Sequence, residues 1–423
     1  MKKLSLFFLT ILMCVSCVKI DTVRDIYNPR ESNEILFSNH IGSAGTKAII
    51  EGNIYDECFT FYVLGTGGYY TSGGTGTVTR MEDSVKYSTP YSAWRTINRT
   101  YFWKFEDGVN TSDPMDFFAI HPAAVDLSGN GANVPFATYT PGANINDIND
   151  QVVTMTGVTP GTVVGGQMDL MTSTADNIVA TRTNTGHINY VDVDNTTHDP
   201  AHGNESSAHG TATDNTVNFK FHHEFAQIKF QARTSAKSHI TITVKKLEFI
   251  VPYIKANAST NGLPTNETYK TTWTLSNAAS DVNHDYTIID YAGDDDNVKY
   301  SVDLVNIENS ANPSWYDLSY HYNSGTDNHN ILVIPQDLSG LADGTMVRIT
   351  YDVTNSMDLS EDCNFTNVVK EIALSKIIDG DNPDEWKAGY IYTYRFDVNL
   401  YEIIFSATVE DWIDVNSNGY VFY

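Results

Sequence analysis

Short runs in which apolar and polar residues alternate, separated by turn residues, occupy most of this sequence. Val217 to Phe221 and Ile240 to Val244 have this period of two, which places every second side chain on one face of a β-strand. Helical periodicity is nearly absent, and only Val368 to Ile377 predicts a short helix. Many short strands without intervening helices favour antiparallel sheets packed as sandwiches over β-α-β units, so we expect an all-β protein.

A long polar stretch divides the chain into two comparable halves. Residues 181–215 are rich in Asn, Asp, Thr and His and contain little to bury, which is typical of an exposed loop. The length of 423 residues suits two or three domains. We therefore expect two tandem antiparallel β-sandwich domains, at residues 48–215 and 216–423. Their expected topology is a Greek key of the transthyretin or immunoglobulin type, with few short helices.

The composition agrees with an all-β chain and excludes some partners. The sequence holds 52 acidic against 26 basic residues, a net charge of −26, which disfavours binding to nucleic acid or to anionic membrane surfaces. Hydrophobic residues make up 41% of the chain, enough to build real cores, and the 25 tyrosines favour a half-buried pleated surface. We expect a folded protein with an acidic surface and no nucleic-acid partner.

The first residues have the pattern of a bacterial export signal. Lys2 and Lys3 form a short basic region, and Leu4 to Met13 is almost wholly apolar but too short to span a bilayer. A small residue directly precedes Cys17, which resembles a lipobox, where signal peptidase cuts before the cysteine and the thiol then carries diacylglycerol. We expect a lipoprotein signal peptide at residues 1–16, with an ordinary signal peptide cut nearby as the alternative.

The expected mature chain is tethered to the outer membrane rather than spanning it. Residues 17–47 would form the tether and a propeptide strand, and acyl chains on Cys17 would contribute about 0.8 kcal/mol per buried methylene. Cys58 and Cys363 are the cysteines that remain after the leader. They could pair with each other, but two ordinary thiols are the favoured interpretation, because two distant cysteines make no disulfide framework.

Several separated segments, taken in order along the chain, resemble the fimbrillin-like (type V pilin) family. The resemblance covers most of the chain, and although each segment is a weak signal alone, their shared order is more specific. The segments are Tyr101-Phe102-Trp103, Asp116-Phe117-Phe118-Ala119-Ile120-His121-Pro122, Gln167-Met168-Asp169-Leu170-Met171, Phe221-His222-His223-Glu224-Phe225-Ala226-Gln227-Ile228, Ile331-Leu332-Val333-Ile334-Pro335-Gln336, Trp386-Lys387-Ala388-Gly389-Tyr390-Ile391-Tyr392-Thr393-Tyr394 and Val409-Glu410-Asp411-Trp412.

The resemblance implies a fimbrial (pilus) subunit or a pilus-associated adhesin on the bacterial surface. Such a protein is exported as a lipoprotein precursor and assembles with other pilus subunits by protease-triggered donor-strand exchange. Its partners would be these subunits, outer-membrane lipid through Cys17, and host or bacterial surface ligands. The implied protein is not an enzyme and needs no cofactor.

The expected processing site follows the first apolar run. Ile35, Leu36 and Phe37 would form the propeptide strand, and a trypsin-like protease would cut between Lys47 and Ala48 in a flexible run rich in glycine. The best-known family site has Arg at this position, so an Arg-specific protease would leave Lys47 intact. A protease of broader specificity, cleavage at Arg24 or Arg30, and no cleavage at all therefore stay open.

Strand exchange has a physical basis that does not depend on the family. A sandwich that lacks one strand exposes an apolar edge, which invites association, and a covering segment keeps the precursor monomeric. After cleavage, a strand from a neighbour can replace the segment through main-chain hydrogen bonds. The C-terminal Tyr420-Val421-Phe422-Tyr423 is the candidate donor strand, with a closing strand of the C-terminal domain as the equally favoured alternative.

Catalytic and metal-binding patterns are weak. His198 and His202 have helical metal-site spacing, but Pro200 between them disfavours a helix. His223-Glu224 begins a near-miss of a zinc protease motif whose fifth position is Gln227. Asp414 starts a calcium-loop pattern whose final Glu would lie beyond the last residue. We expect no catalytic, cofactor-binding or metal-binding residues. The rival interpretation is a monomeric surface lipoprotein that binds glycans or host proteins.

Overall fold

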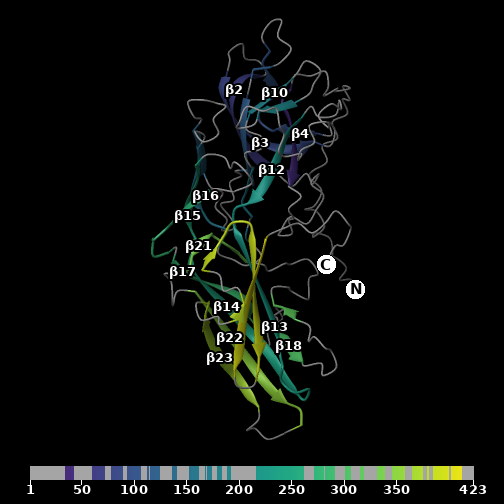
Figure 1. The fold of residues 1–423 in the computed structure, drawn as a ribbon, viewed down its shortest axis with the longest axis vertical. Helices are drawn as coiled ribbons and strands as arrows, with labels where there is room; N and C mark the ends of the chain where they lie inside the picture. The colour runs from purple at the N-terminus through teal and green to yellow at the C-terminus, as the bar shows by residue number, and fades with distance from the viewer. Residues whose placement is uncertain are drawn as a thin grey trace, which may run out of the picture.

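The fold is built almost entirely of β-strands, and Figure 1 shows an elongated molecule with strands of the first half at one end and strands of the second half at the other. The computed structural model describes residues 34–41, 60–71, 78–88, 93–105, 112–113, 115–123, 136–140, 152–161, 167, 169–173, 179–182, 188–191, 216–261, 271–280, 282–290, 301–305, 315–318, 331–338, 345–357, 364–374, 379–380, 384–399 and 402–411. Over these residues the all-β prediction is confirmed. Within them, no helix has the length and apolar character needed to cross a membrane.

A ten-stranded sheet forms the N-terminal end. Its strands are β1 (Leu36–Ile41), β2 (Thr60–Thr71), β3 (Val78–Ser88), β4 (Ala93–Thr96), β5 (Tyr101–Trp103), β6 (Met115–His121), β9 (Met171–Ser173), β10 (Val179–Arg182), β11 (Ile188–Val191) and β12 (Thr216–His223).

Part of this sheet closes on itself. The strands follow the order β6-β9-β12-β1-β4-β3-β2, and β2 pairs back onto β6, so these strands form a closed ring. Closure removes free sheet edges and encloses a core. Alternating residues along the strands, such as Phe61 and Val63 on β2 and Phe117 and Ala119 on β6, point into that core.

Two sheets form the C-terminal end. One contains β13 (Ala226–Arg233), β19 (Tyr316–Asp317), β20 (Ile331–Val333), β24 (Asp379–Gly380), β26 (Tyr390–Val398) and β27 (Ile403–Asp411). The other contains β14 (Ile240–Tyr253), β17 (Val282–Asp290), β18 (Val302–Val305), β22 (Met346–Asn355) and β23 (Phe365–Ala373). A short pair, β21 (Gln336–Asp337) and β25 (Glu385–Trp386), lies beside them.

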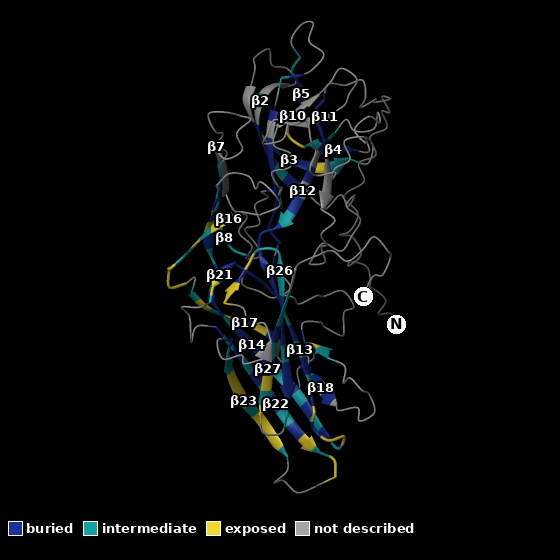
Figure 2. Ribbon diagram, viewed as in Figure 1, coloured by how far each residue is buried: buried dark blue, intermediate teal, exposed yellow. Residues whose placement is uncertain are grey.

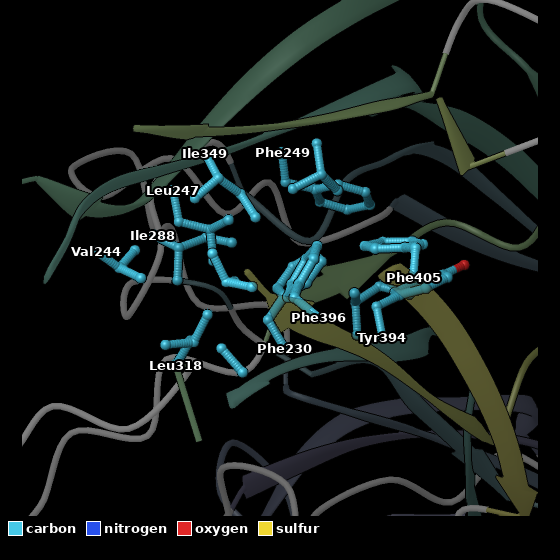
Figure 3. Close-up of a cluster of buried hydrophobic side chains, with 14 of the residues drawn as sticks. Phe230, Val244, Leu247, Phe249, Ile288, Leu318, Ile349, Tyr394, Phe396 and Phe405 are labelled. Carbon is cyan, nitrogen blue, oxygen red and sulfur yellow. The ribbon is translucent and has the colours of Figure 1, made fainter. Parts of the chain in front are cut away.

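The C-terminal core contains a group of aromatic rings next to a group of aliphatic side chains (Figure 3). Figure 3 shows the ring of Phe230 beside that of Phe396, and their centroids are 5.9 Å apart. Phe405 lies 4.5 Å from Phe396, and Phe249 on the facing sheet meets Phe230 edge-on at 5.2 Å. Facing sheets with interdigitated side chains define a β-sandwich.

A four-stranded sheet connects the two halves of the sequence. It contains β7 (Phe136–Thr140) and β8 (Val152–Val158) from the first half, and β15 (Ala256–Asn261) and β16 (Thr271–Leu275) from the second. A separate apolar cluster joins residues of these strands to neighbours from both ends, including Phe118 of β6 and Leu332 of β20.

The expected boundary between residues 215 and 216 falls at the start of β12. This strand pairs with β1 and β9 in the ten-stranded sheet, because Val217, Phe219 and Phe221 face the N-terminal core. Its sequence alternates like that of β13, which follows at once and lies in a C-terminal sheet. Alternation alone does not specify which sheet a strand joins.

Most pairings are antiparallel, as expected, but three pairs of described strands are parallel: β1 with β12, β13 with β26, and β24 with β27. Alternation predicts which face of a strand is buried but not the direction of its neighbour.

The prediction of a short helix from Val368 to Ile377 is wrong over the residues described there. Phe365–Ala373 is instead strand β23, at the edge of the five-stranded sheet, where Figure 2 shows it mostly exposed. Val368 and Ile372 both pack against the core. Their spacing of four residues fits one face of a helix and also one face of a strand, so the periodicity was ambiguous.

Candidate functional site

Strand β1 lies between two strands that come from distant parts of the chain. It pairs in parallel with β12, from Leu36 opposite Thr216 to Ile41 opposite Phe221. On its other side, Phe37 pairs with Trp94 of β4. In Figure 1 it is the purple strand near β4 and β12. The ring of strands is therefore closed by a segment at the beginning of the described chain.

The side chains at the start of β1 are almost completely buried. Ile35, Leu36 and Phe37 are each 1% exposed, and Ile35 and Phe37 belong to the N-terminal core. Burial of a large apolar side chain contributes about 1.5–3 kcal/mol, so this short segment supplies a substantial part of the core's stability.

Phe37 occupies an aromatic pocket made by three strands. Its ring stacks on Phe219 of β12 with centroids 5.6 Å apart and planes inclined by 18°. Phe61 of β2 and Phe117 of β6 meet it edge-on, at 6.3 and 6.0 Å. Stacked and edge-on rings add about 0.5–1.5 kcal/mol per pair beyond the buried area.

An ion pair lies at the entry of β1. Glu34 is 3% exposed, and its two carboxylate oxygens accept hydrogen bonds from Nε and Nη2 of Arg95 on β4, at 2.7 and 3.0 Å. The backbone N–H of Ile35 donates to the carbonyl of Tyr101 at 2.8 Å. Because two parallel hydrogen bonds fix the orientation of the two side chains and the opposite charges compensate each other, this ion pair holds the first residues of β1 in one register.

The other residues predicted for lipidation, processing and strand donation, and the two remaining cysteines, all lie outside the described residues. These are Cys17, Arg24, Arg30, Lys47, Ala48 and the segment from Tyr420 to Tyr423, together with Cys58 and Cys363. Of the predicted site, the structure describes Ile35, Leu36 and Phe37.

A second polar cluster is buried where the ten-stranded sheet meets the C-terminal strands. Nδ1 of His223 lies 2.5 Å from Oδ2 of Asp169, and both side chains are at most 5% exposed. The neighbouring Glu224 is fully buried and accepts hydrogen bonds from Thr172 at 2.5 Å and Thr271 at 3.2 Å. These residues come from β9, β12, β16 and the segments beside them, so the cluster links the ten-stranded sheet to the four-stranded sheet.

Burial shifts the pKa of two groups in this cluster in opposite directions. It raises the pKa of Glu224 to about 8, against the lowering effect of hydrogen bonds from Thr172 and Thr271. It lowers the pKa of His121 to about 4, against the raising effects of the Thr60 carbonyl and of Asp169. At neutral pH, both side chains are therefore held in their uncharged forms.

Gln167 makes a further link between the two ends. Its amide imitates a strand partner for Leu332, accepting from the backbone N–H at 2.7 Å and donating to the carbonyl at 2.8 Å. The hydroxyl of Tyr286 donates to the carbonyl of Gly161 at 2.8 Å in the same region.

The geometry of the polar cluster indicates that it holds neighbouring segments of the chain in position. His223, which began the zinc-like motif, faces Asp169 in the interior. The described part of the chain brings no three His, Cys, Asp or Glu side chains together in a way that could hold a metal ion. His198, His202 and Asp414 lie outside the residues that the structure describes.

Sequence reasoning missed the partners of β1 that are distant in the chain. An acidic residue directly before an apolar run, as Glu34 stands before Ile35, was an available signal that the entry of the strand is held by a charge. Nothing in the spacing indicated that Arg95 supplies that charge, because only the folded sheet brings β4 beside β1.

Comparison with known proteins gives structural similarity but no sequence match. No protein-family model and no curated protein match this sequence. Among solved structures, a fimbrial protein from Bacteroides vulgatus is 14% identical, with 90% of this chain and 99% of that chain covered and a TM-score of 0.46.

Two further similar structures have comparable coverage. A candidate cell adhesion protein from Bacteroides uniformis is 12% identical, with 90% of this chain and 98% of that chain covered and a TM-score of 0.40. The tip fimbrial protein Mfa3 from Porphyromonas gingivalis, with C-terminal truncation, is 10% identical, with 85% and 95% covered and a TM-score of 0.30. At such values, what this chain does must be inferred from its own geometry.

Proposed function

We propose that this chain is a non-catalytic fimbrial subunit or pilus-associated adhesin. It is exported as a lipoprotein precursor, anchored to outer-membrane lipid through Cys17, and activated by proteolysis between Lys47 and Ala48. Cleavage breaks the covalent link between β1 and the rest of the chain. A strand from another subunit can then displace β1 and take its place.

The observation that carries this proposal is the position of β1. It is short, it closes the ring between β12 and β4, and it precedes the expected cleavage site in the sequence. Once the chain is cut after β1, non-covalent contacts retain it: main-chain hydrogen bonds, the packing of Phe37 and its neighbours, and the Glu34–Arg95 pair. A vacant position there exposes an apolar core and the edges of two strands, which favours pairing with another chain.

The test is controlled cleavage of the full precursor. A trypsin-like protease should cut after Lys47, as mass spectrometry would show, and oligomers should then appear in size-exclusion chromatography and electron microscopy. The Lys47→Gln variant should stay uncut at this position and monomeric. Clean cleavage with β1 retained and no oligomer under any subunit mixture would contradict assembly by strand exchange.

The anchor is tested separately from assembly. A protein expressed in a bacterial host should partition into detergent and carry an acylated N-terminus, and Cys17→Ser should abolish both. Cys363→Ser is the matched control and should leave lipidation unchanged. In the Lys47→Gln precursor, which keeps its N-terminal segment, an N-terminus at a residue other than 17 would contradict the lipid anchor while leaving strand exchange untouched.

A further inference from the structure

The position filled by β1 offers each side chain of the strand a different environment, in addition to the main-chain pairing. Glu34 is buried against Arg95, Ile35 enters the core, Leu36 is buried, and Phe37 lies among three aromatic rings. An acidic residue, two aliphatic residues and an aromatic residue thus each have a separate environment.

The acidic position is the most selective of these. A carboxylate that loses its water on burial is strongly disfavoured unless an opposite charge and hydrogen bonds compensate it. Arg95 donates hydrogen bonds to both oxygens of Glu34. The planar pair of donors on its guanidinium binds a carboxylate better than it binds any neutral side chain. A strand with a neutral residue here loses this charge-assisted pair.

The backbone of the strand that carries Arg95 is held in place without β1, by its pairing with β3 and by the turn that follows β4. The buried carboxylate of Asp83 accepts hydrogen bonds from the backbone N–H of Asn98 at 3.2 Å, its side-chain amide at 2.7 Å and the backbone N–H of Arg99 at 3.0 Å. Ile97 also donates to the carbonyl of Ser84 at 2.8 Å. The end of β4 is therefore fixed to β3 by contacts that do not involve β1.

The aromatic position sets the register. Phe37 stacks on Phe219 and meets Phe61 and Phe117 edge-on, so a small side chain would leave a cavity there. A shift by one residue would turn the aromatic side chain out of the core and remove the acid from Arg95. The two selective positions are three residues apart, which defines a pattern that an incoming strand must match.

On the basis of the proposed strand exchange, we propose that the β1 position selects an extended segment of another subunit with the pattern acidic–aliphatic–aliphatic–aromatic. Arg95 is the residue that binds the acidic side chain of this segment. The order of these side chains, rather than apolar character alone, decides which strand replaces β1.

The same pattern occurs a second time in this chain, at the start of β27. Residues 402–406 are Glu-Ile-Ile-Phe-Ser, against Glu-Ile-Leu-Phe-Ser at residues 34–38. In its own sheet, Glu402 is exposed and Ile404 is 48% exposed, whereas Phe405 is buried. A peptide of this sequence is thus a natural probe with the required pattern. The segment 416–423, which holds the candidate donor Tyr420 to Tyr423, has no acidic residue.

The test uses the full chain after cleavage at Lys47 and fluorescent peptides that compete with β1. Uptake is followed by fluorescence anisotropy. A peptide of residues 34–41 and a peptide of residues 402–409 should both enter. The 34–41 peptide with Glu34→Gln should bind about tenfold to a hundredfold more weakly, the factor that a charge-assisted hydrogen-bonded pair supplies. The 416–423 peptide should bind no better than this substituted peptide.

Charge reversal separates recognition by Arg95 from a general effect of the peptide. The Arg95→Glu protein should prefer a 34–41 peptide with Glu34→Lys over the original, whereas Arg348→Glu, a matched change on the five-stranded sheet, should keep the original preference. If Arg95→Glu does not fold, the comparison of the original and Glu34→Gln peptides on the unaltered protein still decides.

The outcomes distinguish the two proposals. Equal binding of the original 34–41 peptide and its Glu34→Gln form, or an unchanged preference in a folded Arg95→Glu protein, would overturn selection by Arg95 but leave strand exchange intact. Entry of no peptide at all, including the 34–41 sequence that matches β1, would overturn strand exchange itself.

Discussion

Phe37 and Phe219 stack with their ring centroids 5.6 Å apart, one from the first described strand and the other from β12. The same two strands pair in parallel along the whole of β1. The same two strands are therefore held together by backbone pairing and by this ring contact, and both keep β1 in the N-terminal core. The ring contact also identifies the most direct way to weaken that strand without touching its hydrogen bonds.

Replacing Phe37 with alanine should lower the free energy of unfolding of the N-terminal end by about 3–5 kcal/mol, because the site loses a buried ring and leaves a cavity. Urea unfolding followed by tryptophan fluorescence measures the change. Phe365→Ala is the matched control, since this ring is 43% exposed on β23 and its loss should cost about 0.5 kcal/mol or less. Equal effects of the two substitutions would contradict the burial of β1.

The raised pKa of Glu224 predicts that stability falls as pH rises. The folded protein keeps the proton of Glu224 up to about pH 8, whereas the unfolded chain releases it near its ordinary value of 4.5. The folded state thus binds more protons in this window, and each pKa unit of difference corresponds to about 1.4 kcal/mol. Glu224→Gln, which is neutral at every pH, should remove this loss.

The comparison of Glu224→Gln with the unaltered protein is sharpest between pH 6.5 and 8. The variant should gain stability relative to the unaltered protein as pH rises through this range, by up to about 2 kcal/mol. Thr271→Val controls for the loss of a single hydrogen bond to the carboxyl group, because it removes one donor without removing the titration. A constant difference between the two proteins at all pH values would contradict a neutral buried Glu224.

The lowered pKa of His121 predicts the opposite slope at acidic pH. The folded protein keeps His121 neutral down to about pH 4, whereas the unfolded chain takes up a proton near its ordinary value of 6.5. Here the unfolded state binds more protons, so this group's contribution to stability is lost as pH falls below 6.5. His121→Gln should be less sensitive to acid than the unaltered protein in urea unfolding at pH 5 and pH 7. A parallel decrease in both proteins would contradict this origin.

Gln167 should contribute more to stability than a partly exposed glutamine. Gln167→Ala leaves the backbone N–H and carbonyl of Leu332 buried without their side-chain partners, and each such loss costs about 1–3 kcal/mol. Gln231→Ala is the control, because its side chain is only partly buried and accepts a hydrogen bond from Arg395. Thermal unfolding should show a clearly lower midpoint for Gln167→Ala alone, and equal midpoints would argue against the link between the two ends.

Sequence periodicity predicted the nature of the elements better than their partners. The alternation in residues 217–221 correctly predicted a strand with Val217, Phe219 and Phe221 on its buried face. It could not predict that this strand pairs with β1 in parallel, because a period of two is the same for either direction and for any neighbour. The error at β23 has a similar origin, since Val368 and Ile372 satisfy both periods.

The strand at the candidate site was predictable from the sequence, but its neighbours were not. The apolar run Ile35, Leu36 and Phe37 predicted a strand, and the structure has β1 beginning at Leu36. Arg95 and Phe219 could not be recognised as its neighbours, because both lie far away in the chain and neither stands in a distinctive local motif.

The sequence by itself determined that the chain is all-β and, in regularly alternating strands such as β12, which side chains are buried. Both depend on local periodicity and on the cost of leaving apolar groups in water. Only the tertiary structure decided that β12 and β4 enclose β1, that Glu34 meets Arg95, and that Asp169, His223 and Glu224 share one buried cluster. These contacts join residues that are distant in the chain, so they arise from how whole sheets pack together, which local patterns do not specify.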